Sequence, residues 1–177
     1  MIDKNRFIAV FEKFNDDLRA FNSSEFESFG TGVPAKWESY KPIIRQIALE
    51  RLQAESWSPH DIGSGLILAA VIKAIEIKES QDLRNNLVPW EPRHNQPSET
   101  VRLRGDLGSG AARLRFERDL FDLFHERREP AELLEDLVDL IGRRYSLIAY
   151  IFYLFDDNQF LPIGTTTFDR AFDELGI

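Results

Sequence analysis

The chain has 177 residues and a formal net charge of −8 at pH 7, and it contains no cysteine. The absence of cysteine excludes disulfides, thiolate metal sites and thiol catalysis. The negative charge argues against attraction of the whole surface to nucleic acid or anionic lipid, although it leaves room for a local basic site.

The length and the N-terminus indicate the class of protein. A chain of this length can bury roughly 70% of its unfolded surface, so one domain over residues 1–177 is expected. The N-terminus leads directly into an amphipathic pattern rather than a signal peptide, and no apolar run approaches the ~20 residues of a membrane-spanning helix. We therefore expect a cytoplasmic protein that does not contact a membrane.

The first helices are predicted from the spacing of apolar residues and from start signals. Five apolar residues recur at alternating spacings of four and three, which predicts a helix over 3–21 with these residues on one face. We expect that face to belong to the core or to a partner interface. A second helix is expected to begin near residue 35 or 41 and to end near residue 53. A third should run over 58–79, because Ser58-Pro59-His60-Asp61 is typical of a capped helix start. The residues of the first face are Phe7, Phe11, Phe14, Leu18 and Phe21.

The second half of the chain is predicted to contain one long loop over 81–110 and four further helices. Within the loop, residues 100–104 alternate between polar and apolar and indicate a short strand. The helices are expected over 111–127, 130–142 and 145–155, and from about residue 165 to a stop at Gly176.

The segment 145–155 is the most apolar stretch, since ten of its eleven residues are apolar or aromatic. A helix that is apolar on every side is buried on every side, so we expect it at the centre of the fold. It is either the second half of a longer helix beginning near Pro130 or a helix held by burial alone. The pattern as a whole predicts an all-α fold: a single-domain helical bundle of six or seven helices with one long loop and at most two very short strands.

Arginines gather in the loop and at the start of the helix that follows it. Residues 93–118 contain six arginines against three acidic residues, a local charge of 6 − 3 = +3. Exposed N–H groups at that helix start favour an anion, and arginine binds phosphate or carboxylate through two parallel hydrogen bonds. The alternative is that these arginines pair with acidic residues of neighbouring helices. The predicted anion-binding or partner-binding residues are Arg93, Arg102, Arg104, Arg113 and Arg115.

A second pattern consists of Arg118 and His125, seven residues apart on one helix face, with Asp119 directly after the arginine. It resembles the Arg-x6-His form of the signature of HEPN domains, which are small all-α bundles. The resemblance implies a metal-independent ribonuclease that dimerises, in which Arg118 holds the scissile phosphate and His125 performs acid–base chemistry on the RNA 2′-hydroxyl. The alternative is an ion pair between Arg118 and Asp122, with His125 favoured at the helix C-terminus by the helix dipole.

Two further patterns are less specific. Asp61, Glu76 and Lys78 have the rough spacing of a Pro-Asp…Glu-x-Lys nuclease, but that site needs two adjoining strands where this sequence predicts a helix. The segments 85–90 and 160–172 resemble uncharacterised bacterial proteins from restriction or phage-defence settings, sometimes found alongside an HNH nuclease domain. No metal site and no cofactor are predicted.

The sequence therefore favours a bacterial, non-enzymatic interaction domain that docks a protein or nucleic-acid partner through the arginine-rich loop and the adjacent helix start. The alternative is a HEPN-like ribonuclease that uses Arg118 and His125, with homodimerisation as one option. Either function is expected to lie away from the segment 145–155, which contains no titratable side chain except tyrosine.

Overall fold

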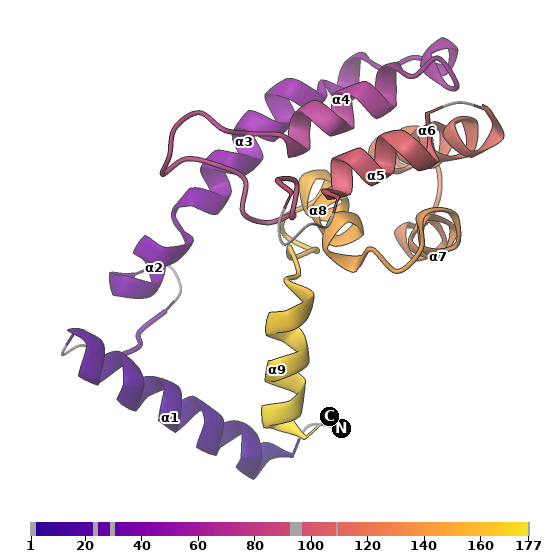
Figure 1. Cartoon of the computed structure of the whole chain (residues 1–177). Helices are drawn as coiled ribbons and strands as arrows, with labels where there is room; N and C mark the ends of the chain where they lie inside the picture. The colour runs from indigo at the N-terminus through magenta and orange to yellow at the C-terminus, as the bar shows by residue number, and fades with distance from the viewer. Residues whose placement is uncertain (1–2, 23–24, 29–30, 93–96, 109, 177) are drawn as a thin grey trace. The chain divides into compact units, whose positions relative to one another are not determined.

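The computed structural model describes residues 3–22, 25–28, 31–92, 97–108 and 110–176, with residues 165–167 described through their backbone alone. These residues form nine α-helices and two short 3-10 helices, so the predicted all-α fold is confirmed (Figure 1). Among them the β pairing is one isolated bridge between Lys78 and Arg84. The α-helices are α1 (Lys4–Asn22), α2 (Gly32–Glu38), α3 (Tyr40–Leu52), α4 (Leu66–Ile75), α5 (Glu99–Asp106), α6 (Gly110–Phe124), α7 (Pro130–Ile141), α8 (Tyr145–Phe155) and α9 (Thr165–Leu175), and the 3-10 helices are η1 (Ala54–Ser56) and η2 (Pro59–Asp61).

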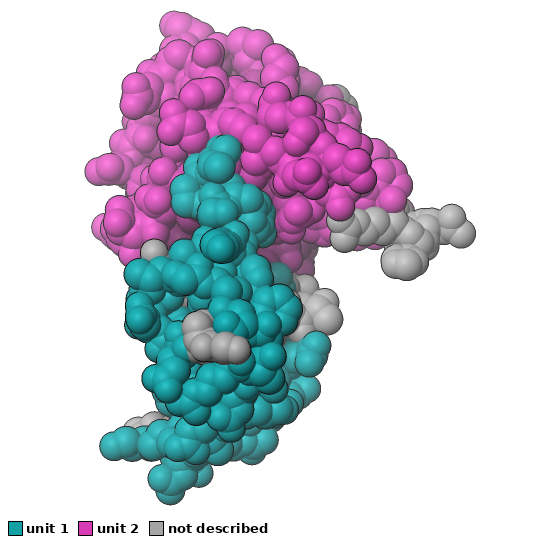
Figure 2. Space-filling view, turned by 90° about the vertical axis from the view of Figure 1, so that its left-hand side faces the viewer, with its two compact units in different colours: residues 1–43, 164–177 teal, residues 44–163 magenta. Residues whose placement is uncertain are grey.

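The chain forms two compact units, which are coloured separately in Figure 2. Unit 1 consists of residues 1–43 and 164–177, so it combines the two ends of the chain. Unit 2 consists of residues 44–163. The expectation of a single domain over residues 1–177 stays a prediction.

Unit 1 contains α1, α2 and α9, and its described residues form a small core. α1 forms where the apolar spacing predicts it, and Leu18 on the predicted face is 2% exposed. The rings of Phe11 and Phe14 pack edge-on against Phe26, with ring centroids 5.7 and 5.5 Å away. Arg6 of α1 donates hydrogen bonds of 2.6 and 2.8 Å to carbonyls in the last turn of α9, which stabilises that helix end.

The core of unit 2 is built around α8, as its apolar run predicts. Seven of the eleven residues of α8 are buried, including Tyr150. The Tyr150 hydroxyl donates a 2.9 Å hydrogen bond to the Ala74 carbonyl of α4. The helix α4 is itself largely buried. α4 also contacts α6, α6 contacts α7, and α7 contacts α8. The two most apolar helices, α4 and α8, therefore supply much of the core of this bundle.

α8 is a separate helix and does not continue α7. α7 ends before Gly142, whose φ of +78° is incompatible with a right-handed helix. At its other end α8 is capped by Arg45, which donates to the carbonyls of Tyr153 and Leu154 at 3.1 and 3.2 Å and pairs with Asp157 at 3.2 Å. Burial, together with this cap, therefore holds α8, and the option of one long helix from Pro130 is wrong.

The helix predicted over 58–79 is interrupted. Its start signal forms, since the Asp61 carboxylate accepts hydrogen bonds from the Ser58 N–H and hydroxyl at 2.7 and 2.8 Å. This cap closes only the turn η2, because Gly63 and Gly65 then adopt φ of +87° and +95°, and α4 begins at Leu66. A right-handed helix needs negative φ at every residue, so the two glycines separate the turn from the helix.

The strand predicted over 100–104 is wrong, because these residues lie in α5. The Ser98 hydroxyl accepts a 3.3 Å hydrogen bond from the Val101 N–H, which caps the helix start. Leu103 and Leu107, four residues apart, are both fully buried on one side of this segment. The irregular stretch is therefore shorter than the predicted loop, and α5 and the short α2 are the helices beyond the seven expected.

Candidate functional site

Four of the five predicted arginines lie on α5 and α6 in the described part of unit 2, and Arg93 lies outside the described residues. Arg104 of α5 forms a bidentate pair with Glu76, with two N–O distances of 2.9 Å. The Thr100 hydroxyl donates to the same carboxylate at 2.7 Å. The Arg104 guanidinium and the Thr100 hydroxyl hold the pKa of Glu76 below its usual range.

The other charged residues of α5 also have partners within unit 2. Arg102 lies 3.8 Å from Glu99, one turn earlier on the same helix. Glu99 lies 3.6 Å from Arg144, and Arg144 pairs with Asp106 at the other end of α5. The residue that precedes α8 therefore binds both acidic residues of α5.

Arg113 lies at the start of α6 and turns toward backbone rather than toward a carboxylate. Its Nη1 donates a 2.9 Å hydrogen bond to the Gly108 carbonyl. The same nitrogen lies 3.6 Å from the position that a Cβ atom would take on Gly65. Its buried Nε has no hydrogen-bond partner among the described residues.

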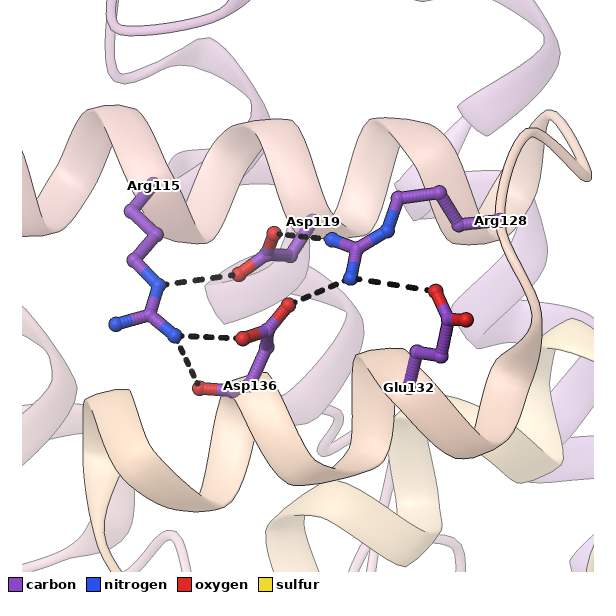
Figure 3. A network of polar contacts seen from close by, with 5 residues as sticks. All are labelled: Arg115, Asp119, Arg128, Glu132 and Asp136. Carbon is purple, nitrogen blue, oxygen red and sulfur yellow. Dashed lines mark hydrogen bonds and ion pairs between the residues drawn. The ribbon is translucent and has the colours of Figure 1, made fainter.

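Arg115 belongs to a network of five charged residues that joins α6 to α7 (Figure 3). Asp136 of α7 accepts 2.7 Å hydrogen bonds from Arg115 and from Arg128, which lies between the two helices. Asp119 of α6 is 4% exposed and lies 3.4 Å from Arg128 and 4.0 Å from Arg115. Glu132 completes the network at 3.7 Å from Arg128.

The two aspartates of this network differ in their electrostatics. Burial raises the pKa of the Asp119 carboxyl to about 6; the nearby Asp136 carboxylate acts in the same direction, and the two arginines oppose it. Hydrogen bonds from Arg128 and Arg115 hold the pKa of Asp136 below its usual range. Asp119 is therefore the aspartate of this pair that takes up a proton first as the pH falls.

Sequence reasoning missed Asp119, Arg128 and Asp136 as members of one network. The available signals were the four-residue spacings from Arg115 to Asp119 and from Glu132 to Asp136, which place each pair on one helix face. Neither spacing indicates that the two faces meet.

The contacts of the arginine-rich region match the alternative in which arginines pair with acidic residues of neighbouring elements. Arg104 binds Glu76, and Arg115 binds Asp136. Within the described residues, these arginines do not converge on one shared group. The side chains of Arg102, Arg104 and Arg115 nevertheless remain 39%, 49% and 46% exposed.

Arg118 and His125 lie on α6 and directly after it. The Arg118 side chain is exposed and forms no hydrogen bond or ion pair with any described residue, so the alternative pair with Asp122 is not formed. The His125 ring stacks on Phe121 with centroids 4.1 Å apart, and its Nδ1 lies 3.0 Å from the Phe121 carbonyl. A rise of about 1.5 Å per residue separates the two positions by about 10 Å along the helix axis.

Asp61, Glu76 and Lys78 do not converge on a common site. Asp61 caps its own turn, Glu76 is held by Arg104, and Lys78 pairs with Glu91 at 3.0 Å. In the part of the chain that the structure describes, no three His, Asp or Glu side chains form a group that could hold a metal ion.

Unit 1 exposes large aromatic side chains at its described surface. On α1, Phe7 is 50% exposed and Phe21 is 71% exposed, although both belong to the face predicted as a core or a partner interface. Trp37 of α2 is 48% exposed, and its ring centroid lies 5.7 Å from that of Phe21. Phe172 of α9 is 44% exposed.

Comparisons with protein-family models, with curated proteins and with solved structures found no match to this chain. The resemblances to HEPN domains and to bacterial defence-associated proteins therefore stay predictions. Among the described residues, no helix is both long and apolar enough to cross a membrane.

Proposed function

We propose that this protein is a non-enzymatic interaction module that docks a partner protein through the exposed aromatic surface of unit 1. This aromatic surface consists of Phe7, Phe11, Phe21, Trp37 and Phe172, whose exposed fractions range from 40% to 71%. Aromatic residues are enriched at protein interfaces and supply much of their binding energy. The exposure of these rings is the observation that carries the proposal.

The small size of unit 1 supports the proposal that it binds a partner protein. Unit 1 has 43 + 14 = 57 residues, and the buried residues among those described are Leu18 and Pro34. Units of about 60 residues are only marginally stable even when their cores are well packed. Covering the aromatic surface with another protein would add the burial that the described core does not supply.

The charge of unit 1 favours a protein over a nucleic acid. Residues 1–43 and 164–177 contain seven lysines and arginines against ten acidic residues, a net charge of 7 − 10 = −3. Nucleic-acid binding depends mainly on neutralising phosphates, which a net negative surface opposes. We therefore place the partner site on unit 1 and treat the arginines of α5 and α6 as a secondary route.

A photo-cross-linking amino acid at position 21 tests this proposal in the cells that make the protein. The expected product is a protein–protein cross-link that is lost when Phe7 and Trp37 are both replaced by serine. A band at twice the chain mass would identify a second copy as the partner. The matched control is the same cross-linker at Leu161 of unit 2, which is 68% exposed but lies outside the aromatic surface. Cross-links at both positions, at neither, or to nucleic acid would contradict the proposal.

The second candidate function is the HEPN-like ribonuclease, and one observation favours it. Arg118 is exposed and has no partner among the described residues, so its guanidinium is free to bind a phosphate. The hydrogen bond of His125 engages Nδ1, which leaves proton transfer to Nε2. The resemblance implies a dimer. In that arrangement, two copies of the chain would together bring the Arg118 and His125 side chains to one phosphate.

Incubation with labelled RNA at low salt and without added metal separates the two candidates. Under the ribonuclease hypothesis, His125→Ala should slow cleavage by about 10²-fold or more, the usual contribution of a general acid or base. His60→Ala is the matched control, because His60 is an exposed histidine of the same unit. Under the leading proposal, the wild type and both variants leave the RNA uncleaved. If the protein binds the RNA without cleaving it, and the affinity falls steeply as the salt concentration rises, the result would instead support docking through the arginines of α5 and α6.

A further inference from the structure

The segment that joins η2 to α4 presents backbone N–H groups in an unusual conformation. Gly63 and Gly65 both have positive φ, and Ser64 lies between them. The Ser64 hydroxyl accepts a 3.1 Å hydrogen bond from the Leu66 N–H at the first position of α4. Three further N–H groups, those of Gly63, Gly65 and Leu68, are left for a ligand that does not come from this segment.

That ligand is the carboxylate of Glu117, which reaches the segment from α6. Its Oε2 accepts hydrogen bonds from the N–H groups of Gly63 and Gly65 at 2.7 and 3.2 Å. Its Oε1 accepts a hydrogen bond from the Leu68 N–H at 2.9 Å. Glu117 is 0% exposed, so the carboxylate interacts with these amides in place of water.

The surroundings of residues 63–68 favour a bound anion and limit which amino acids can occupy this segment. The N-terminal end of a helix carries partial positive charge, which stabilises a carboxylate there. The positive φ of Gly63 favours glycine at that position, and a Cβ atom there would lie 2.8 Å from the end of the exposed Leu114 side chain, which would have to move. Arg113 lies beside Gly65 and adds a positive charge to this end of α4.

We propose that residues 63–68 form a carboxylate-binding cradle, that Glu117 is its built-in ligand, and that a free carboxylate of the acetate class binds there when this side chain is removed. The substitution Glu117→Ala deletes one methylene group and one carboxylate beyond Cβ, which are the heavy atoms of acetate. The cradle therefore has a defined ligand size as well as a defined charge. This inference is independent of the proposed docking function.

Acetate titration of Glu117→Ala tests the cradle. Urea unfolding is followed at pH 7 in sodium acetate and in sodium chloride of equal ionic strength. A ligand that binds only the folded state lowers the apparent unfolding constant about tenfold for each tenfold rise in concentration above its Kd. We expect this dependence for Glu117→Ala with acetate and a weaker one with the larger propionate. If the variant is unfolded in chloride, acetate should restore its folded signal.

Two comparisons make the test specific. The wild type and Glu117→Gln fill the cradle with their own side chains, so acetate should affect them no more than chloride does. Hydrogen exchange at the amides of Gly63, Gly65 and Leu68 should be slow in the wild type, fast in Glu117→Ala, and slow again when acetate is added. An equal acetate effect on all three proteins, or a Glu117→Ala protein that acetate neither stabilises nor refolds, would overturn the proposal.

Discussion

Replacing Glu117 with leucine is expected to lower the free energy of unfolding of unit 2 by roughly 3–5 kcal/mol, because each buried N–H group left without a partner costs about 1–3 kcal/mol. The substitution removes the acceptor for the N–H groups of Gly63, Gly65 and Leu68 while keeping a side chain of similar size. Urea unfolding measures the change. A Trp37→Phe background restricts the fluorescence signal to Trp57 and Trp90, which both belong to unit 2.

Glu135→Leu is the matched control for this prediction. Glu135 is an exposed glutamate of α7, so its replacement should change the free energy of unfolding by less than about 0.5 kcal/mol. A loss below about 1 kcal/mol for Glu117→Leu would mean that the three N–H groups find water or other acceptors. The contrast between the two variants separates the loss of a buried ligand from a general effect of removing charge.

Asp119→Asn is expected to remove a pH-dependent destabilisation of the wild type. The pKa of the Asp119 carboxyl is raised to about 6 in the folded protein, above the value of about 3.9 for an unfolded chain. Between these values the folded state binds more protons, so the contribution of Asp119 to stability falls as the pH rises from about 4 to 6. Relative to Asp119→Asn, the wild type should therefore lose about 2 kcal/mol between pH 4.5 and pH 7.

The measurement is urea unfolding of both proteins at pH 4.5, 5.5 and 7. Only the difference between the two proteins is informative, because carboxylates whose pKa is lowered, such as Glu76 and Asp136, make the whole protein less stable in acid. Asp139→Asn is the control, since Asp139 is exposed on α7 and lies outside the network in Figure 3. A constant difference between wild type and Asp119→Asn across this range would mean that the folded and unfolded pKa values of Asp119 are equal.

Local sequence patterns predicted much of the fold where the deciding contacts are close in the chain. The apolar spacing from Phe7 to Phe21 predicted α1, and the Ser58–Asp61 cap formed as expected. The strand error over 100–104 also has a local origin, because a short alternating segment is compatible with a helix once Ser98 caps it.

The candidate sites depended on contacts that are distant in the chain. The arginine-rich region was recognisable from charge, but the partner of Arg104 lies 28 residues away and that of Arg115 lies 21 residues away. Opposite charges that distant pair only when packing of apolar faces brings their helices together. For that reason the sequence left open whether these arginines bind an external anion or internal carboxylates.

The sequence by itself determined that this protein is all-α and that α8 is buried, because helix periodicity and an all-round apolar surface are local properties. Only the tertiary structure decided where α4 begins, since the Glu117 ligand of the cradle lies 49 to 54 residues from the N–H groups it binds. It also decided that Leu18 is the buried residue of the α1 face, while Phe7 and Phe21 stay exposed. A periodic pattern marks an apolar face, but only the arrangement of neighbouring helices determines how much of that face, from Phe7 to Phe21, is covered.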